Sequence, residues 1–273
     1  MIEFFKMSGS GNDFILIDNR NQSLDVGDIT DFVKTVCERK VSVGADGLIL
    51  IENSDCADFR WRFFNADGSE VEMCGNGGRC AARFAIIKGI AKENLSFETQ
   101  AGIIDAEVRG DMVKLRLTDP HQTRVNISIQ IDERPFEVNF INTGVPHVVH
   151  FVKHLDLFDV FAVGRKIRYH SEFQPAGTNA NFVESIDRHT IRVRTYERGV
   201  EDETLACGTG AVASALISSS KGFVESPVDV RVKSGETLKI YFSKTDSGFQ
   251  DIYLEGKAKV VYEGRIWNEV YKR

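Results

Sequence analysis

The stretch Met73-Cys74-Gly75-Asn76-Gly77-Gly78 decides the fold, because a second copy of its core follows at Ala206-Cys207-Gly208-Thr209-Gly210. In each copy a cysteine precedes a Gly-x-Gly turn, and an apolar run typical of a helix follows the turn. A thiol at the start of a helix meets the positive end of the helix dipole, which lowers its pKa from about 8.5 toward neutrality. The free N–H groups of the same turn can bind a carboxylate. The sequence therefore predicts two matched anion-binding turns, each with a reactive thiol.

The two copies are in register with other glycine turns. The offset between the cysteines is 207 − 74 = 133 residues. Adding 133 to Gly11 and Gly44 gives Gly144 and Gly177, and each of these four glycines precedes an apolar, strand-like run. We interpret the pattern as a duplication that produced two similar lobes. The alternative is a chance alignment, since the chain has 23 glycines.

The coarse pattern predicts an α+β fold. Each half is expected to hold mostly antiparallel strands around one helix that starts at its cysteine and ends near residue 89 or 221. Apolar spacing predicts two further helices, at 29–37 with Asp28 as N-cap and at 160–169. The stretch from 121 to 135 is polar and mixed, and no element is expected there. Asp119-Pro120 is the best candidate boundary between the halves.

Composition excludes several classes of function. The 273 residues have a formal net charge of −6 and a pI near 5.6, which argues against nucleic-acid binding. The chain has no apolar run of the ~18 residues that a membrane span needs. Five cysteines at irregular spacings disfavour a disulfide framework. We therefore expect a cytoplasmic protein that binds neither membranes nor nucleic acids.

Two matched thiols suit the inversion of a carbon acid. Inversion requires removal of a proton from one face of a carbon and its return to the other face. One base on each face achieves this, one as thiolate and the other as thiol, and helix N-termini stabilise the developing charge. No cofactor is then required, and the chain has no P-loop or complete dinucleotide fingerprint.

Other interpretations of the cysteines remain open. A thiol redox protein or peroxidase would use them differently, but such proteins keep C-x-x-C pairs or a nearby resolving thiol. Cys74-x5-Cys80 resembles half of a zinc site, yet no second pair has suitable spacing, so we expect no metal. Cys37, Cys56 and Cys80 are expected to be inert. A binding module without activity would not explain two cysteines in matching turns.

Three ordered motifs carry a resemblance to the diaminopimelate epimerase family. They are Phe5-Lys6-Met7 with Gly11-Asn12-Asp13-Phe14, Asn65-Ala66-Asp67-Gly68 with Met73-Cys74-Gly75-Asn76-Gly77, and Tyr196-Glu197-Arg198-Gly199 with Ala206-Cys207-Gly208-Thr209-Gly210. The likeness extends from Met1 through the last strand. It implies a pyridoxal-independent isomerase that interconverts L,L- and meso-diaminopimelate in lysine and peptidoglycan biosynthesis. It also implies two pseudo-symmetric lobes, each a barrel-like sheet around a central helix, of residues 1–117 with 263–273 and of residues 118–262. The expected partner is the small substrate, and a homodimer is considered.

The resemblance also assigns roles to residues. Cys74 and Cys207 match the two catalytic bases. His147 and Glu197 match residues that tune the thiol pKa values. The positions that match substrate-binding residues are Asn12, Asn65, Gly75, Asn76, Asn179, Glu197, Arg198, Gly208 and Thr209.

Two positions depart from a common form of the family pattern. Val145 stands where many members have Asn, and Gly47 stands where some have Gln. Each change removes a side-chain hydrogen bond to substrate. The nearest alternative function is another two-cysteine racemase, such as a proline or hydroxyproline epimerase. The Arg198 side chain and the asparagines favour a substrate with a second polar end.

Overall fold

The computed structural model describes residues 1–22, 24–246 and 248–271. The chain forms two compact units, one of Met1–Leu115 with Gly256–Arg273 and the other of Arg116–Glu255. The C-terminal strand pairs with the first strand from Lys259 onward, so the return to the first unit starts ahead of the expected position 263. The last two residues of the expected segment 263–273 lie outside the described residues.

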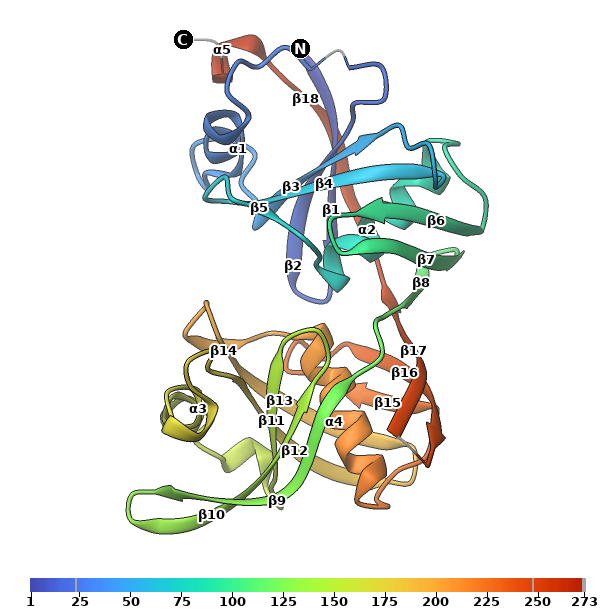
Figure 1. Cartoon of the computed structure of the whole chain (residues 1–273). Coiled ribbons are helices and arrows are strands. Elements are labelled where there is room, and N and C mark those ends of the chain that lie inside the picture. The colour runs from blue at the N-terminus through green and yellow to red at the C-terminus, as the bar shows by residue number, and fades with distance from the viewer. Residues whose placement is uncertain (23, 247, 272–273) are drawn as a thin grey trace. The chain divides into compact units, whose positions relative to one another are not determined.

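The first unit contains the N-terminal strands and the last strand of the chain (Figure 1). Its elements are β1 (Ile2–Gly9), β2 (Asn12–Asp18), α1 (Ile29–Cys37), β3 (Gly47–Glu52), β4 (Phe59–Asn65), β5 (Glu70–Val71), α2 (Gly75–Ile87), β6 (Asn94–Thr99), β7 (Gly102–Arg109), β8 (Met112–Arg116), β18 (Lys259–Ile266) and α5 (Asn268–Tyr271).

The second unit repeats this series of elements. They are β9 (His121–Ile131), β10 (Arg134–Asn142), β11 (Pro146–Phe151), α3 (Val160–Arg168), β12 (Asn179–Asp187), β13 (Thr190–Glu197), β14 (Asp202–Thr204), α4 (Gly208–Ser220), β15 (Val228–Arg231), β16 (Thr237–Thr245) and β17 (Gly248–Lys257), with short 3₁₀ turns at Leu155–Leu157 and Ser171–Phe173.

Strand pairing is the same in both units. The order is β18-β1-β2-β3-β4-β6-β7-β8 in the first and β9-β10-β11-β12-β13-β15-β16-β17 in the second. The pairs β2–β3 and β4–β6 are parallel, as are their counterparts β11–β12 and β13–β15, and the other pairs of these two series are antiparallel. The predicted α+β fold with two pseudo-symmetric lobes is confirmed.

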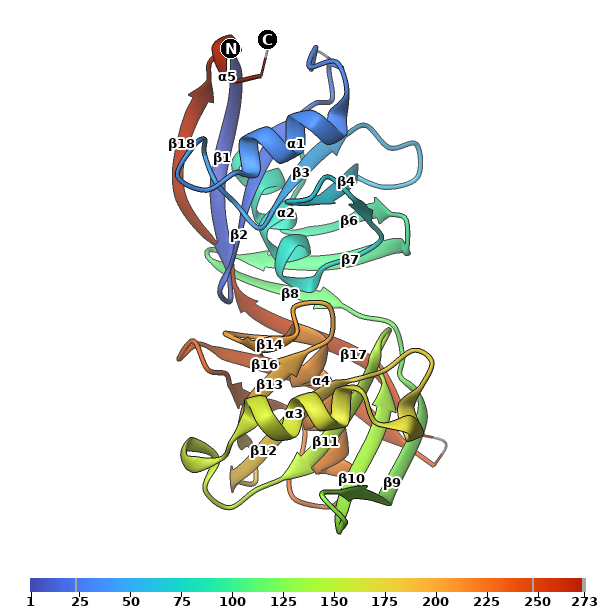
Figure 2. The same ribbon diagram turned by 90° about the vertical axis from the view of Figure 1, so that its left-hand side faces the viewer.

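Each sheet curves around one central helix, α2 or α4. The α4 helix contacts strands β10 to β13, β15 and β16, and Gly210 to Ser219 are buried on every side of it. Its residues are mostly small or apolar, as expected for a helix enclosed by strands. The α1 and α3 helices are amphipathic instead and pack on the outside of their sheets (Figure 2). Asp28 caps α1 by accepting a hydrogen bond from Asp31 N, as predicted.

One hairpin was missed by the sequence prediction. The stretch 121–135 contains the long strand β9 and its turn into β10, where Arg134 pairs with Ile131. Most β9 side chains are exposed and its first four residues are polar. The alternation of Val125, Ile127, Ile129 and Ile131 with polar residues was nevertheless a strand signal that the sequence prediction overlooked. The turn residues Asp132 and Glu133 both have positive φ, at 50° and 62°. They form a two-residue hairpin turn without the glycine or asparagine that usually marks one.

This turn yields a stability prediction. Replacing Glu133 with Gly should raise the free energy of unfolding by about 0.5–1 kcal/mol, because glycine adopts positive φ without the steric cost of a Cβ atom. Urea unfolding of the full chain measures the change. The control is Glu133→Ala, which removes the same carboxylate but keeps the Cβ. Equal stability of the Gly and Ala variants would contradict the prediction.

Candidate active site

Both cysteines occupy the N-cap position of a central helix. Cys74 precedes α2 with φ −143° and ψ 117°, and Cys207 precedes α4 with φ −122° and ψ 112°. Their carbonyl oxygens accept the first helical hydrogen bonds, from Gly78 N at 2.8 Å and Ala211 N at 2.9 Å. The N–H groups of residues 75–77 and 208–210 therefore have no carbonyl partner within their helix. Each thiol starts a helix beside three such donors, as the sequence predicted.

The two thiols differ in exposure. Cys207 is 8% exposed, whereas Cys74 is half-buried. The backbone conformations of the two cysteines are similar, so their φ and ψ angles do not explain the difference.

The turn after Cys74 is held by a chain of side-chain hydrogen bonds. Arg79 Nη2 donates to Asn76 Oδ1 at 2.9 Å and to Ser10 Oγ at 2.7 Å. Asn76 Nδ2 donates to Asn12 Oδ1 at 2.8 Å, and Asn12 Nδ2 donates to Asp46 Oδ2 at 2.9 Å. The structure thus brings together two predicted site residues, Asn12 and Asn76, with their amides oriented. Arg79 is fully buried. Sequence reasoning missed it, although a cation four residues after Gly75 in an apolar helix was a signal.

The turn after Cys207 is held by a different set of side chains. His147 Nε2 lies 3.0 Å from Thr209 Oγ1, and Thr209 Oγ1 lies 3.6 Å from Cys207 Sγ. Asn181 Nδ2 lies 3.1 Å from His147 Nδ1. Sequence reasoning selected Asn179 but missed Asn181. The two-residue period of a strand places both on one face, and that signal was available.

His147 is neutral at physiological pH. The side chain is fully buried, and this burial, with a smaller effect from the charge of Arg198, lowers its pKa to about 3. His147 therefore does not tune the thiol pKa as a charged imidazole, which would favour the thiolate directly. The hydroxyl of Thr209 contacts both His147 Nε2 and Cys207 Sγ, and so connects the two side chains.

Arg198 and Asn179 form a second polar group. Asn179 Oδ1 accepts from Arg198 N at 2.8 Å, and Asn179 Nδ2 donates to Pro146 O at 3.1 Å. Arg198 Nη1 donates to Ala176 O at 2.8 Å, which fixes one end of the guanidinium. Burial raises the pKa of Glu197, the preceding residue. This group can bind an anion and hydrogen-bond its neighbours.

Asn65 and Gly47, two further positions singled out from the sequence, lie in the first unit. Asn65 Nδ2 donates to Ser69 Oγ at 3.2 Å and is exposed. Gly47 lies against β4, where a Cβ would overlap the Phe64 carbonyl and the Phe63 ring. The glycine at this departure from the family pattern therefore allows close packing of β3 on β4.

The other cysteines are poor candidates for a base. Burial raises the pKa of Cys37 to about 12, so it stays a thiol. Cys80 is buried in α2, and Cys56 is exposed beside Ser54. Over the described parts of the chain, no three His, Cys, Asp or Glu side chains cluster as metal ligands would. Within the same residues, no helix combines the length and apolar character required to cross a membrane.

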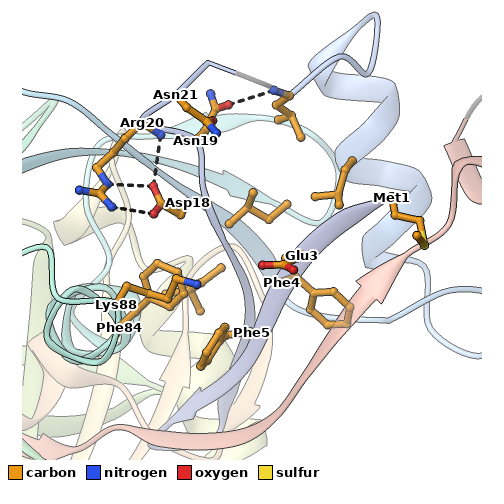
Figure 3. Close-up of a pocket in the computed structure, with 14 residues that line it drawn as sticks. Met1, Glu3, Phe4, Phe5, Asp18, Asn19, Arg20, Asn21, Phe84 and Lys88 are labelled. Carbon is orange, nitrogen blue, oxygen red and sulfur yellow. Dashed lines mark hydrogen bonds and ion pairs between the residues drawn. The ribbon is translucent and has the colours of Figure 1, made fainter.

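A cavity of about 680 Å³ lies elsewhere in the first unit (Figure 3). Its walls include Phe5, the Asp18–Arg20 ion pair, and Phe84 with Lys88 at the C-terminal end of α2. Cys74 is at the opposite end of that helix. The cavity therefore does not contain the reactive turn, and shape alone does not locate the chemistry.

Known sequences identify the family. The sequence profile described as diaminopimelate epimerase matches residues 4–122 and 139–261. A diaminopimelate epimerase of Aquifex aeolicus is 49% identical over 280 residues, covering 98% of this chain and 99% of the relative. One of Archaeoglobus fulgidus is 46% identical over 277 residues, covering 96% and 95%.

Solved structures share the fold at low sequence identity. A PhzF-family phenazine biosynthesis protein of Bacillus anthracis has a TM-score of 0.74 at 19% identity, covering 97% of this chain and 99% of that one. A hydroxyproline epimerase of Agrobacterium vitis has a TM-score of 0.71 at 12% identity, covering 99% and 96%. These likenesses concern the fold alone, whereas the family match extends through both cysteine turns. The chain belongs to the diaminopimelate epimerase family.

Proposed function

We propose that the chain is a cofactor-independent epimerase that interconverts L,L- and meso-diaminopimelate, with Cys74 and Cys207 as its two bases. The observation that carries the proposal is the pair of cysteines at matched N-cap positions of two central helices. Family membership supports the substrate. The proposed setting is lysine and peptidoglycan biosynthesis in the cytoplasm, and the proposed assembly is a homodimer.

The chemistry assigns each thiol a complementary state. One sulfur, as thiolate, takes the α-proton from one face of the carbon while the other, as thiol, delivers a proton to the opposite face. In the reverse direction the two exchange roles. The helix-start N–H groups after each cysteine bind the reacting carboxylate and stabilise the charge that develops as the proton leaves. One preorganised donor of this kind contributes about 10²–10³-fold to turnover.

The group around Arg198 is proposed to bind the distal end of the substrate. The reacting carboxylate has the N–H groups of the two turns, so a further fixed cation is best explained by a second carboxylate. A guanidinium matches a carboxylate through two parallel hydrogen bonds. Asn65 and Asn179 would hydrogen-bond the remaining polar atoms there. Proline and hydroxyproline lack this distal end, which disfavours the alternative racemase.

The base assignment predicts the effect of removing either sulfur. Cys74→Ala and Cys207→Ala should each abolish epimerisation of both isomers, because inversion needs an acid and a base on opposite faces. Chromatographic separation of L,L- and meso-diaminopimelate measures the conversion, with circular dichroism to verify folding. The matched control is Cys56→Ala, at an exposed cysteine outside the turns, which should retain full activity. Near wild-type turnover in either turn variant would disprove the two-base proposal.

The Arg198 assignment predicts a change in specificity. Arg198→Lys should raise the KM for diaminopimelate steeply, because an ammonium cannot form the paired hydrogen bonds of a guanidinium. Lysine, which lacks the distal carboxylate, should be a poor substrate of the wild type by several orders of magnitude in kcat/KM. Arg198→Lys should then lower kcat/KM for lysine as a substrate by little more. Wild-type epimerisation of lysine as fast as diaminopimelate would contradict this assignment.

The neutral His147 predicts a pH dependence of stability. Below its unfolded pKa of about 6.5, the unfolded chain binds a proton that the folded chain, with a pKa of about 3, does not bind. Stability from this residue is therefore complete above pH 6.5 and falls as pH decreases toward 3, by up to about 1.4 kcal/mol per pH unit.

The effect can be isolated by comparing urea unfolding at pH 7 and pH 5. His147→Gln should lose about 1–2 kcal/mol less than the wild type over this interval. His121→Gln, at an exposed histidine, should behave as the wild type. The same loss in wild type and His147→Gln would show that His147 is not held neutral by the fold.

A further inference from the structure

The amide of Asn181 has a single possible orientation. The residue is fully buried in β12. Its Nδ2 lies 2.9 Å from the carbonyl oxygen of Val148, and its Oδ1 lies 2.9 Å from Thr195 Oγ1. A backbone carbonyl only accepts hydrogen bonds, so the nitrogen of the amide must face Val148. Thr195 then donates its hydroxyl hydrogen to Oδ1.

This orientation determines the tautomer of His147. The second hydrogen of Asn181 Nδ2 is directed at His147 Nδ1, 3.1 Å away, so Nδ1 must be the acceptor. Burial keeps the ring neutral, and a neutral imidazole carries one proton. That proton is therefore on Nε2, which donates to Thr209 Oγ1 at 3.0 Å.

The direction of donation in these hydrogen bonds then extends to Cys207. Because Thr209 Oγ1 accepts from His147, its own hydrogen is available to donate. Cys207 Sγ lies 3.6 Å from that oxygen, within the longer range of hydrogen bonds to sulfur. A hydrogen bond donated to a sulfur favours the thiolate over the thiol.

Gly210 makes room for this arrangement. A Cβ at position 210 would overlap the Asn181 amide oxygen and lie 3.3 Å from Cys207 Sγ. In the first unit the corresponding Gly77 faces the side chains of Ile49 and Trp61 instead. The second turn thus requires glycine because of a polar contact, whereas in the first turn a Cβ would only crowd apolar side chains.

We call the hydrogen bonds from Asn181 through His147 and Thr209 to Cys207 the relay. At the corresponding described positions of the first half, the relay has no counterpart. In the register of the parallel strand pairs, His147 corresponds to Phe14 and Asn181 corresponds to Ile49. Neither counterpart has a side chain that can donate or accept a hydrogen bond. The two thiols, alike in backbone, therefore differ in the groups that set their protonation.

We propose that Asn181 is a positioning residue that fixes His147 as the Nε2–H tautomer and so directs the Thr209 hydroxyl hydrogen onto the sulfur of Cys207. The inference rests on the proposed role of Cys207 as a base and names the side chains that hold it ready as a thiolate. The charged residues at this end of the unit include Glu197 and Arg198 at the end of β13, and Asp202 and Glu203 of β14, which pairs with it. No charged side chain is present in α4.

The test measures the thiol directly. In the full-length protein, the rate of iodoacetamide alkylation of Cys207 is followed against pH by mass spectrometry of its peptide. Asn181→Ser should raise the apparent pKa of Cys207 and slow its alkylation at pH 7 about tenfold, a shift of one pKa unit. The pH profile of kcat/KM should move to higher pH by the same amount.

Asn139→Ser is the matched control. Asn139, in β10, also has a buried side-chain amide. Its Nδ2 donates to the carbonyl of Val149 in β11, next to Val148, which accepts from Asn181. Its removal should lower stability without changing the pH dependence of Cys207 alkylation. An unchanged alkylation profile in Asn181→Ser, or an equal shift in Asn139→Ser, would overturn the inference.

A second pair of variants tests the hydrogen bond that the Thr209 hydroxyl donates to Cys207. This test does not depend on whether Asn181→Ser folds. Thr209→Val should shift the alkylation profile as Asn181→Ser does, and Thr209→Ser, which keeps the hydroxyl, should restore it. A Val variant with the wild-type profile would contradict the relay. Alkylation needs no turnover, so a failure of the relay is distinguishable from a failure of the proposed epimerase activity.

Discussion

The structure depends on two helices that start at a cysteine inside their own sheet. A helix start leaves three N–H groups without carbonyl partners, and these groups need an anion, a polar side chain or water. Enclosing α2 and α4 within strands restricts access to these groups, and we propose that the turn after each cysteine is a preformed anion site. The small residues Gly, Ala and Ser that dominate α4 let the strands approach the helix closely.

The duplication explains the shared framework, and its divergence explains the chemistry. Strand order, parallel pairs and helix starts match between the two units, which gives both thiols the same backbone environment. The side chains around the turns differ. The first turn is oriented by a buried cation, Arg79, through Asn76 and Asn12, and the second by neutral donors from β11 and β12. In each direction a two-base isomerase needs one thiol deprotonated and the other protonated, and different side chains can set the two states separately.

Much of this was predictable from the sequence. Both central helices, the Asp28 cap, the α+β class and the duplication follow from glycine spacing and apolar periodicity, because these are local signals. Strand β9 was missed because its first four residues are polar and its turn at Asp132-Glu133 lacks glycine, although the alternation from Val125 to Ile131 was a usable strand signal. Arg79 and Asn181 each had a local signal, but their roles depend on partners remote in sequence, such as Ser10 and His147, which no local pattern reveals. The neutral state of His147 likewise follows from burial, which no local pattern reports.

The most direct measurement of the central claim is the deuterium content of both isomers after brief incubation of L,L-diaminopimelate with the enzyme in deuterated water. With two bases, the proton is taken by one sulfur and a deuteron is delivered by the other. The account predicts deuterium at the inverted carbon of the meso product while the remaining L,L substrate still carries protium. Deuterium appearing in recovered L,L-diaminopimelate as fast as in the meso product would indicate one base that serves both faces, and would contradict the account.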